Sequence, residues 1–357
     1  MRKQLVVLCA AFMTLPALAA IDITDNFSVS GFGSTSWARS DNSTPLLVNR
    51  EIANENCWDC DTVFGIQADY YQGGLHASAQ VVKRPQKHWS EPHLEWAYLG
   101  YSFSDWQATV GRQRLPYGLA SEYFYVGHAY TTARLQQDYY NSLLGITSYD
   151  GVSLKWNSSL NDSTLISLVP FYGMGTDGEF IRYTSQLSLK FKSDYTYGVN
   201  GTLEGDQYKL NLVYFRSKYQ EIARFDQLGL VIDDTPKVHF ELYSLGFEYD
   251  FQPVKVTIEG QKNDENAAWY LQADYRLQSF VPYVSYGQSF NGDYDMTNDT
   301  YTVGLRYDLI YNVSLNAEWN RLQSQQNENG TYYRGAFLDA PSEPSANLYT
   351  VMVNFVF

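Results

Sequence analysis

Apolar and polar side chains alternate at every second position along most of this chain, and this pattern constrains the fold more than any other feature. Residues 253–262, 266–277, 299–309 and 311–320 each place apolar residues on one face and polar or charged residues on the other. A period of two is that of an extended strand. Charged residues recur on the polar face, as Arg306 does in the third run. Because burying an unpaired charge is costly, we expect the polar face to meet water and the apolar face to meet lipid.

The number and spacing of these runs predict a closed barrel. Seventeen can be recognised, at 26–38, 61–72, 74–83, 93–103, 105–114, 147–157, 163–172, 180–192, 194–204, 207–217, 237–251, 253–262, 266–277, 279–290, 299–309, 311–322 and 346–357. A bacterial barrel made from one chain has an even number of strands, with short periplasmic turns and longer external loops. That rule places 172–193 in one external connection, with 180–192 extending above the membrane. We therefore predict an all-β fold, a transmembrane antiparallel β-barrel of sixteen strands.

The first nineteen residues predict a secretory signal peptide. Arg2 and Lys3 precede a short apolar stretch, and Ala17-Leu18-Ala19 offers the small residues of a cleavage site. We expect 1–19 to be removed and 20–357 to form a single barrel domain in the cell outer membrane. No later segment reaches the roughly 18 consecutive apolar residues of a membrane-spanning helix, which excludes a helical membrane protein.

Composition narrows the classes of partner. The formal net charge of -14 argues against nucleic acid, which binds basic surfaces. The chain has 31 Tyr, and only 18% of its residues are charged, which suits a wall that is apolar outside and wet inside. A soluble secreted β-protein is the alternative.

Cys57 and Cys60 predict a small structural disulfide, because an exported protein folds in an oxidising compartment. A zinc or redox role is the alternative for this C-x-x-C, but no second Cys or His pair accompanies it. The histidines have no metal-ligand spacing and no phosphate-binding glycine loop is present, so we expect neither metal nor cofactor.

One long connection, from about residue 115 to 146, lacks strand alternation. It has seven aromatic residues between Tyr117 and Tyr140, which indicates that it packs against something. Long ordered loops are usually functional. We expect this one to fold into the lumen and narrow it, because a barrel of sixteen strands is otherwise wide open.

Two segments carry a family resemblance. The stretch Gly111-Arg112-Gln113-Arg114-Leu115-Pro116-Tyr117-Gly118-Leu119, followed by Arg134, is similar to the G-x-x-x-x-P-[FY]-G pattern of phosphate-selective porins and related outer-membrane channels. Leu94-Glu95-Trp96-Ala97-Tyr98 also resembles this group. The resemblance implies a trimeric, sixteen-stranded channel in outer-membrane lipid, whose third external loop sets the constriction. The chain departs from the phosphate-selective pattern in having few lysines around the loop, which puts anion selectivity in doubt.

The end of the chain carries a second resemblance. Tyr349, Val351, Val353, Phe355 and Phe357 alternate up to the terminal aromatic residue. This resembles the closing strand of outer-membrane barrels, which implies that Phe357 is recognised by the outer-membrane assembly machinery.

Charges at the constriction are expected to set selectivity. Loop candidates are Glu122, His128, Arg134 and Asp138. Candidates at inward strand positions are Glu95, Lys155, Lys209, Lys255, Glu259, Asp274, Arg276, Arg306 and Glu318. Both signs occur, as would suit a transverse field, although many could simply be solvated lumen groups. By strict alternation Arg112 and Arg114 point outward, towards lipopolysaccharide phosphates, unless a bulge near Gly111 turns them into the pore.

These features predict a porin that passes small hydrophilic solutes and ions by passive diffusion. A channel preferring anionic or dicarboxylate-like solutes is the first alternative. An outer-membrane hydrolase is less favoured: His76 and Ser78 share an inward face, but no glycine-rich oxyanion turn follows them. An adhesin or receptor barrel would use the long polar connections 39–60, 217–237 and 323–345.

Overall fold

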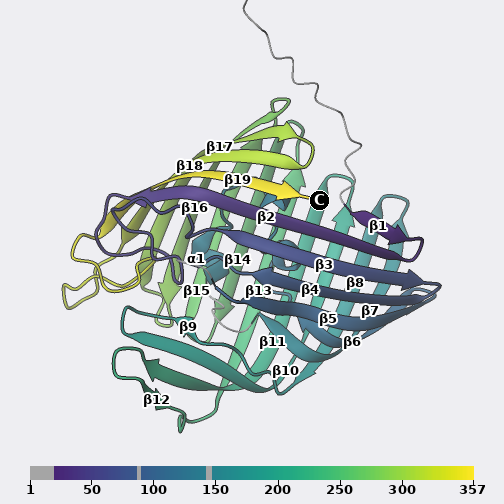
Figure 1. Ribbon diagram of the computed structural model, residues 1–357, viewed down its shortest axis with the longest axis horizontal. Coiled ribbons are helices and arrows are strands. Elements are labelled where there is room, and N and C mark those ends of the chain that lie inside the picture. The colour runs from purple at the N-terminus through teal and green to yellow at the C-terminus, as the bar shows by residue number, and fades with distance from the viewer. Residues whose placement is uncertain (1–19, 87–89, 142–146) are drawn as a thin grey trace, which may run out of the picture.

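The computed structural model describes residues 20–86, 90–141 and 147–357, and all nineteen strands of these residues belong to one antiparallel sheet (Figure 1). Within those residues, sixteen long strands make up the wall: β2 (Phe27–Ser40), β3 (Val63–Gln72), β4 (Leu75–Lys83), β5 (Pro92–Phe103), β6 (Trp106–Arg114), β7 (Ser148–Asn161), β8 (Thr164–Met174), β10 (Leu187–Gly205), β11 (Tyr208–Phe225), β13 (Val238–Asp250), β14 (Val254–Asn263), β15 (Asn266–Tyr275), β16 (Phe280–Asn291), β17 (Met296–Ile310), β18 (Val313–Ser324) and β19 (Ser345–Val356). Each pairs with the next, and β19 pairs with β2, so the sheet closes into the predicted barrel.

Three short strands lie outside this wall. β1 (Ile21–Thr24) pairs with β2, whereas β9 (Ile181–Arg182) and β12 (Leu230–Ile232) pair with the ends of β10 and β11. The pairing of β8 with β10 ends at Met174 and Tyr195. Residues 187–194 of β10, and the residues of β11 that pair with them, therefore project past the end of β8. Residues 187–192 are not a separate run. They are the first residues of β10. A register shift between Ser193 and Tyr195 separates them from the rest of that strand and interrupts the alternation in the sequence.

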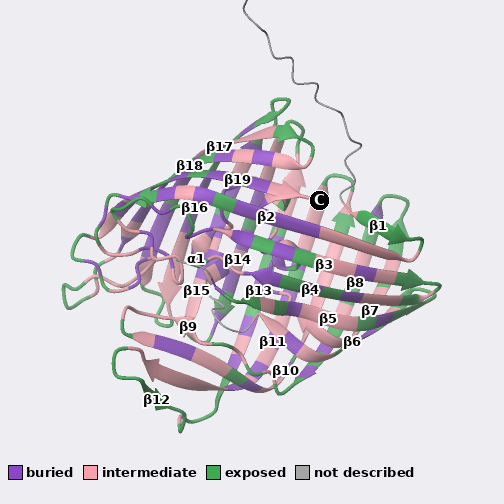
Figure 2. Ribbon diagram, in the orientation of Figure 1, coloured by how far each residue is buried: buried purple, intermediate pink, exposed green. Residues whose placement is uncertain are grey.

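The two faces of the wall differ as the alternation predicts (Figure 2). Outward apolar side chains are exposed, among them Val110, Val303 and Val351, which are 54%, 49% and 50% exposed. Inward polar residues such as Ser314 and Asn354 are buried. In the part of the chain that is described, no helix has the length and apolar character needed to span a membrane.

The seam at which β19 pairs with β2 and closes the barrel contains contacts between glycines and aromatic rings. The backbone N–H of Gly31 donates to the carbonyl of Phe357 at 2.8 Å, and that of Phe357 donates back at 2.9 Å. A Cβ atom at Gly31 would overlap the ring of Phe357, and one at Gly33 would overlap the ring of Phe355. The rings of Phe357 and Phe355 therefore lie over Gly31 and Gly33 of β2, where any other residue would place a Cβ atom.

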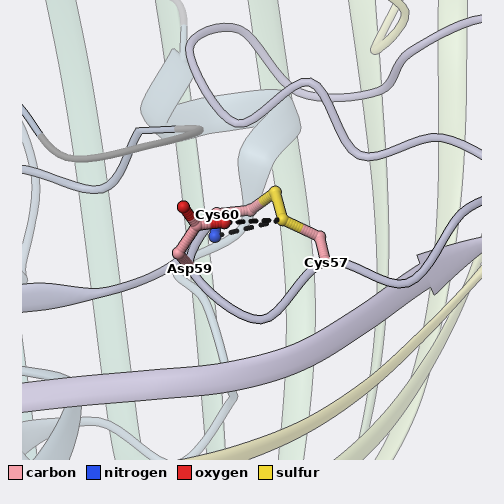
Figure 3. A group of neighbouring side chains, drawn as sticks. All are labelled: Cys57, Asp59 and Cys60. Atoms are coloured by element: carbon pink, nitrogen blue, oxygen red, sulfur yellow. Dashed lines mark hydrogen bonds between the residues drawn. A yellow bond between two sulfur atoms is a disulfide. The ribbon is translucent and has the colours of Figure 1, made fainter.

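Cys57 and Cys60 form a disulfide in the connection between β2 and β3 (Figure 3). The backbone of Cys57 exchanges two hydrogen bonds with that of Ala38 on β2. Both cysteines belong to an apolar cluster with Leu46 and Phe337. The disulfide therefore closes a local turn within this connection, and the backbone hydrogen bonds of Cys57 with Ala38 hold that turn against β2.

Candidate constriction site

The segment after β6 folds into the barrel. It contains two 3₁₀ turns, η1 (Ser121–Tyr123) and η2 (Gly127–Ala129), and the short helix α1 (Gln137–Tyr140), which lies against β14 to β17. Residues 142–146, the last of the predicted loop, lie outside the described residues. We call residues 115–141 the lumen loop.

Glu259 on β14 is a buried wall residue that anchors the lumen loop. Its side chain is 0% exposed. It accepts the N–H of Leu119 at 2.6 Å, the hydroxyl of Tyr140 at 2.6 Å and the hydroxyl of Tyr270 at 2.5 Å. A charge-bearing acceptor with three donors holds two parts of the loop against the wall.

Arg134 is the second anchor of the lumen loop. Its Nε donates to Asp61 Oδ1 at 2.8 Å, a second guanidinium nitrogen donates to Asp61 Oδ2, and Nη1 donates to Thr350 Oγ1 at 2.8 Å. The side chains of Arg134 and Asp61 are only 4% and 2% exposed. Burial alone would raise the pKa of Asp61, but Arg134 and Arg50 together hold it well below its usual range. Arg134 is thus a buried anchor instead of a hydrated pore charge.

Charges on β17 and β18 hold the loop backbone. Glu318 accepts the N–H of Ala133 at 2.9 Å, and Nη1 of Arg306 donates to the carbonyls of His128 and Tyr130 at 2.9 and 2.7 Å. The imidazole of His128 also contacts Ser314 and the carbonyl of Tyr311. Burial, followed by the charge of Arg306, lowers the pKa of His128.

Arg114 and Glu95 form a buried pair beside the start of the loop. Glu95 is 1% exposed and accepts from Arg114 Nη2 at 2.5 Å and from Arg84 Nε at 2.6 Å. The guanidinium of Arg114 lies 5.0 Å from the ring centroid of Tyr125 on the lumen loop. This contact contradicts the outward alternative for Arg114, whose side chain turns towards the lumen loop and not towards lipopolysaccharide.

Arg112 has a different partner. It makes a two-pronged bond to Asp150 on β7, with both N–O distances at 2.8 Å, and the two side chains are 31% and 39% exposed. Gly111, which precedes Arg112 on β6, has a φ of +128°, a conformation that favours glycine. The pairing of β6 with β5 and with β7 is continuous through Gly111, so the backbone has this unusual φ without the inserted residue of the predicted bulge.

The other strand candidates fall into two groups. Lys255 lies 3.2 Å from Glu248 and 3.7 Å from Asp274, while Arg276 pairs with Asp250 at the turn end of the barrel. These residues form ion pairs along one part of the wall.

Lys155 and Lys209 remain partly exposed, and Glu122 and Glu204 are exposed. Lys209 stands opposite Glu204 on β10 and opposite Glu248 on β13. Glu204 and Glu248 were not among the sequence candidates, although both occupy inward positions of alternating strands. These hydrated charges of both signs line the wall away from the buried anchors.

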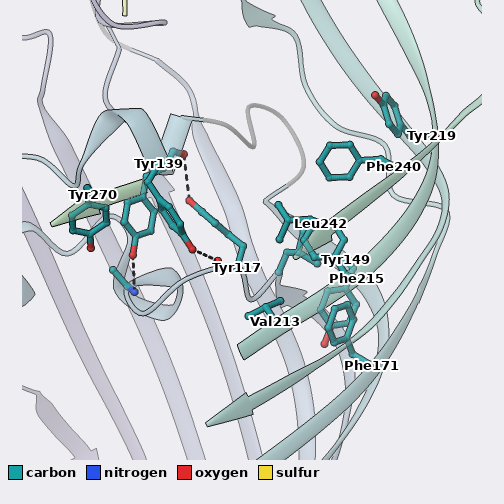
Figure 4. Close-up of a cluster of buried hydrophobic side chains, with 13 residues drawn as sticks. Tyr117, Tyr139, Tyr149, Phe171, Val213, Phe215, Tyr219, Phe240, Leu242 and Tyr270 are labelled. Carbon is teal, nitrogen blue, oxygen red and sulfur yellow. Dashed lines mark hydrogen bonds between the residues drawn. The ribbon is translucent and has the colours of Figure 1, made fainter. Parts of the chain in front are cut away.

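An aromatic cluster also lies inside the barrel (Figure 4). Tyr117, Tyr139 and Tyr140 of the lumen loop pack with inward residues of the wall. The wall residues are Tyr149, Phe171, Val213, Phe215, Tyr219, Phe240, Leu242 and Tyr270. The expectation of strongly polar inward faces is therefore wrong for this region. The run 212–215 is apolar at both inward and outward positions, a signal of burial on both faces that was present in the sequence.

The residues proposed for a hydrolase are engaged elsewhere. Ser78 Oγ accepts from the indole N–H of Trp96 at 3.0 Å. His76 lies 3.7 Å from Asp69 and stacks on Tyr71 with ring centroids 4.3 Å apart. These contacts do not join His76 to Ser78 as a general base is joined to a nucleophile.

Asp138 of α1 makes the loop sensitive to pH. Its Oδ1 accepts from Asn298 at 2.6 Å and from Thr300 at 3.2 Å, while Oδ2 is buried without a hydrogen-bond partner in the described structure. Burial raises its pKa from 3.8 to about 6. The folded state therefore binds this proton more tightly than the unfolded state, and stability falls as pH rises from about 4 to about 6.

The substitution Asp138→Asn is expected to remove that loss. Each pKa unit corresponds to about 1.4 kcal/mol, so the variant should gain at most about 3 kcal/mol over the native chain at pH 7.5 and much less at pH 4.5. Urea unfolding in detergent at the two pH values measures the difference. Glu122→Gln, in the same loop but exposed, is the control and should show no such pH dependence. Equal effects of the two substitutions would contradict the assignment.

A closed barrel whose lumen is narrowed by an inward-folded loop defines an outer-membrane channel. The chain belongs to the Gram-negative porin family, whose profile matches residues 5–328. It is located in the outer membrane and is a non-enzymatic channel protein. No match was found among curated protein sequences.

Solved structures show the same fold at low identity. OmpT, an outer membrane protein of Vibrio cholerae, is 11% identical with a TM-score of 0.58, covering 94% of this chain and 99% of its own. The anion-selective porin from Comamonas acidovorans is 12% identical with a TM-score of 0.58, covering 93% and 100%. OmpF of Salmonella typhi, solved with daunomycin, is 16% identical with a TM-score of 0.58, covering 93% and 98%.

Proposed function

We propose that this porin is a general diffusion channel for small hydrophilic solutes and ions, with little preference for either sign of charge. The observation that supports this most directly is the division of the lumen charges into two groups. Arg114, Arg134, Glu259 and Glu318 are buried where the lumen loop meets the wall. Glu122, Lys155, Glu204 and Lys209 keep contact with water.

A passage for hydrated solutes must follow the charges that stay hydrated, because desolvating an ion is costly. We therefore place it between the lumen loop near Glu122 and the wall formed by β7, β10 and β11. The hydrated glutamates Glu122 and Glu204 beside it are matched by Lys155 and Lys209, and Glu248, opposite Lys209, is matched by Lys255. The alternative preference for anionic or dicarboxylate-like solutes would need exposed cations in excess, and the arginines that suggested it are paired with Glu95, Asp61 and Asp150.

Planar-bilayer recording tests this proposal. The purified protein should conduct, and its reversal potential in a salt gradient should lie near zero. Glu122→Lys replaces a negative charge beside the passage with a positive one and should shift the reversal potential towards anion selectivity. Glu328→Lys, at an exposed position of the external connection 325–344, adds the same charge away from the passage and should leave it unchanged. Absence of conductance would refute the channel, and equal shifts in the two variants would refute the location of the passage.

Three partners belong to the same proposal. We propose a homotrimer, supported by the trimer form in which OmpT of Vibrio cholerae has been solved. The exposed apolar outer face fits outer-membrane lipid, with lipopolysaccharide at the loop end. The terminal Phe357 remains the proposed signal for the assembly machinery, and its ring lies at the seam that closes last along the chain.

A further inference from the structure

The connection between β8 and β10 reaches across the mouth of the barrel. In the order of the wall, β8 and β10 stand half-way round the ring from the seam between β2 and β19. Residues 175–186, which join β8 to β10 and which we call the strap, nevertheless contact the connections on either side of that seam. These are residues 41–62, between β2 and β3, and residues 325–344, between β18 and β19. Because β9 within the strap also pairs with the start of β10, the strap and the two connections that it contacts together span the opening.

Arg182 makes the contacts to the first of these connections. Its backbone N–H donates to Asn49 Oδ1 at 3.1 Å. Its guanidinium Nε lies 3.3 Å from Glu51 Oε1, and the two side chains are 39% and 22% exposed.

Tyr183 and Ser185 make the contacts to the second connection. The guanidinium of Arg334 donates to the carbonyl of Tyr183 and lies 3.9 Å from its ring centroid. The backbone N–H of Ser185 donates to Asp339 Oδ1 at 3.2 Å. The far end of the strap is thus held by backbone and side-chain bonds together.

The near end of the strap is held on its own side. Glu179 lies 2.6 Å from His93 Nδ1 on β5, and Asp177 lies 2.8 Å from Lys190 on β10. With both ends fixed, the strap is a bridge and not a free loop, so a solute must pass on one side of it or the other.

We propose that the strap is a second, outer filter that sets the largest solute admitted to the porin, with Arg182 and Arg334 as its specificity-determining residues. This proposal rests on the proposed channel function. The far-end contacts lie outside the strand pairing of the wall, whereas β9 within the strap pairs with Ser188 and Leu189 of β10. Because the far-end contacts are partly exposed ion pairs and single hydrogen bonds, each is weak on its own. Removal of the side chains of Arg182 and Arg334 takes away the contacts to Glu51 and Tyr183, which loosens the far end of the strap and leaves the barrel intact.

The variant Arg182→Ala/Arg334→Ala tests the filter in proteoliposomes. Swelling rates are measured with a monosaccharide, a disaccharide and a trisaccharide. The monosaccharide rate should stay within about twofold, and the trisaccharide rate should rise by at least about fivefold, because a bar across a pore hinders large solutes most. Arg321→Ala is the matched control: it removes an arginine that donates to Ser345 near the same end of the barrel without touching the strap.

Cross-linking gives a second, reversible test. In Glu51→Cys/Arg182→Cys/Arg334→Ala, oxidation should keep the trisaccharide rate near the native value, and reduction should raise it to that of the double alanine variant. The native protein treated with the same reductant is the control, because reduction also opens the disulfide between Cys57 and Cys60. Heat-modifiable migration on gels verifies that each variant is folded. An unchanged ratio of trisaccharide to monosaccharide rates in the folded alanine variant would overturn the filter. A native protein that passes not even the monosaccharide would instead overturn the channel function.

Discussion

Replacement of Arg134 by methionine is expected to destabilise the protein by about 3–5 kcal/mol and to increase its conductance. The methionine keeps most of the side-chain volume but leaves the buried carboxylate of Asp61 with Arg50 as its remaining cationic partner. The loss of the larger of two cationic interactions with a carboxylate that is only 2% exposed accounts for the loss of stability. The conductance rises because the lumen loop loses its bond to Thr350 on β19 and moves away from the wall. Urea unfolding and single-channel recording measure the two effects.

Two further variants separate the causes. Arg134→Met/Asp61→Asn removes both charges and should recover part of the stability, since no carboxylate is left unpaired. Arg134→Lys keeps the charge but cannot bind both oxygens of Asp61 in the same plane, so it should give an intermediate value. A folded Arg134→Met variant with native stability and native conductance would show that the loop is held in place without this residue.

Glu259→Ala is expected to have a comparable effect through hydrogen bonding. The substitution leaves the N–H of Leu119 and the hydroxyls of Tyr140 and Tyr270 without their acceptor. An unsatisfied buried donor costs about 1–3 kcal/mol, so three donors together should cost about 3–9 kcal/mol. The loop should loosen where it contacts β14, which channel recordings would show as increased current noise.

Glu259→Gln is the matched control for that prediction. The amide has nearly the same shape and retains a carbonyl oxygen for Leu119 or a tyrosine, so we expect it to lose about a third to a half as much stability. Equal losses for alanine and glutamine would mean that the ionised carboxylate, and not the number of bonds, determines the effect. No loss for alanine would contradict the anchor.

The barrel could be predicted from the sequence because membrane and water impose the alternation locally, residue by residue. The lumen loop was predicted for a similar reason, since its aromatic residues break the pattern within one segment. The register shift at Ser193 and Tyr195 was not predicted, and it made one strand resemble two. The strap across the mouth left no local signal at all, because its partners come from the opposite side of the ring.

The candidate site could be predicted only in part. Alternation shows which side chains point inward, but not what lies opposite them inside the barrel. Arg134 meets Asp61 across 73 residues of chain, and Leu119 meets Glu259 across 140. Because of such distant contacts, residues that were predicted to be pore charges are buried and hold the lumen loop against the wall. Local pattern gave no means of telling these from Glu122 or Lys155, which stay in water.

The partners of the lumen loop come from both ends of the chain, and this dictates when the passage becomes narrow. Asp61 is made early, whereas Thr350 belongs to the last strand, and both bind Arg134. The part of the loop around Arg134 therefore cannot complete its contacts until the final strand has joined the first, whereas the part bound to Glu259 needs only β14 and β15. We expect the lumen to reach its narrowest state only once the seam has closed.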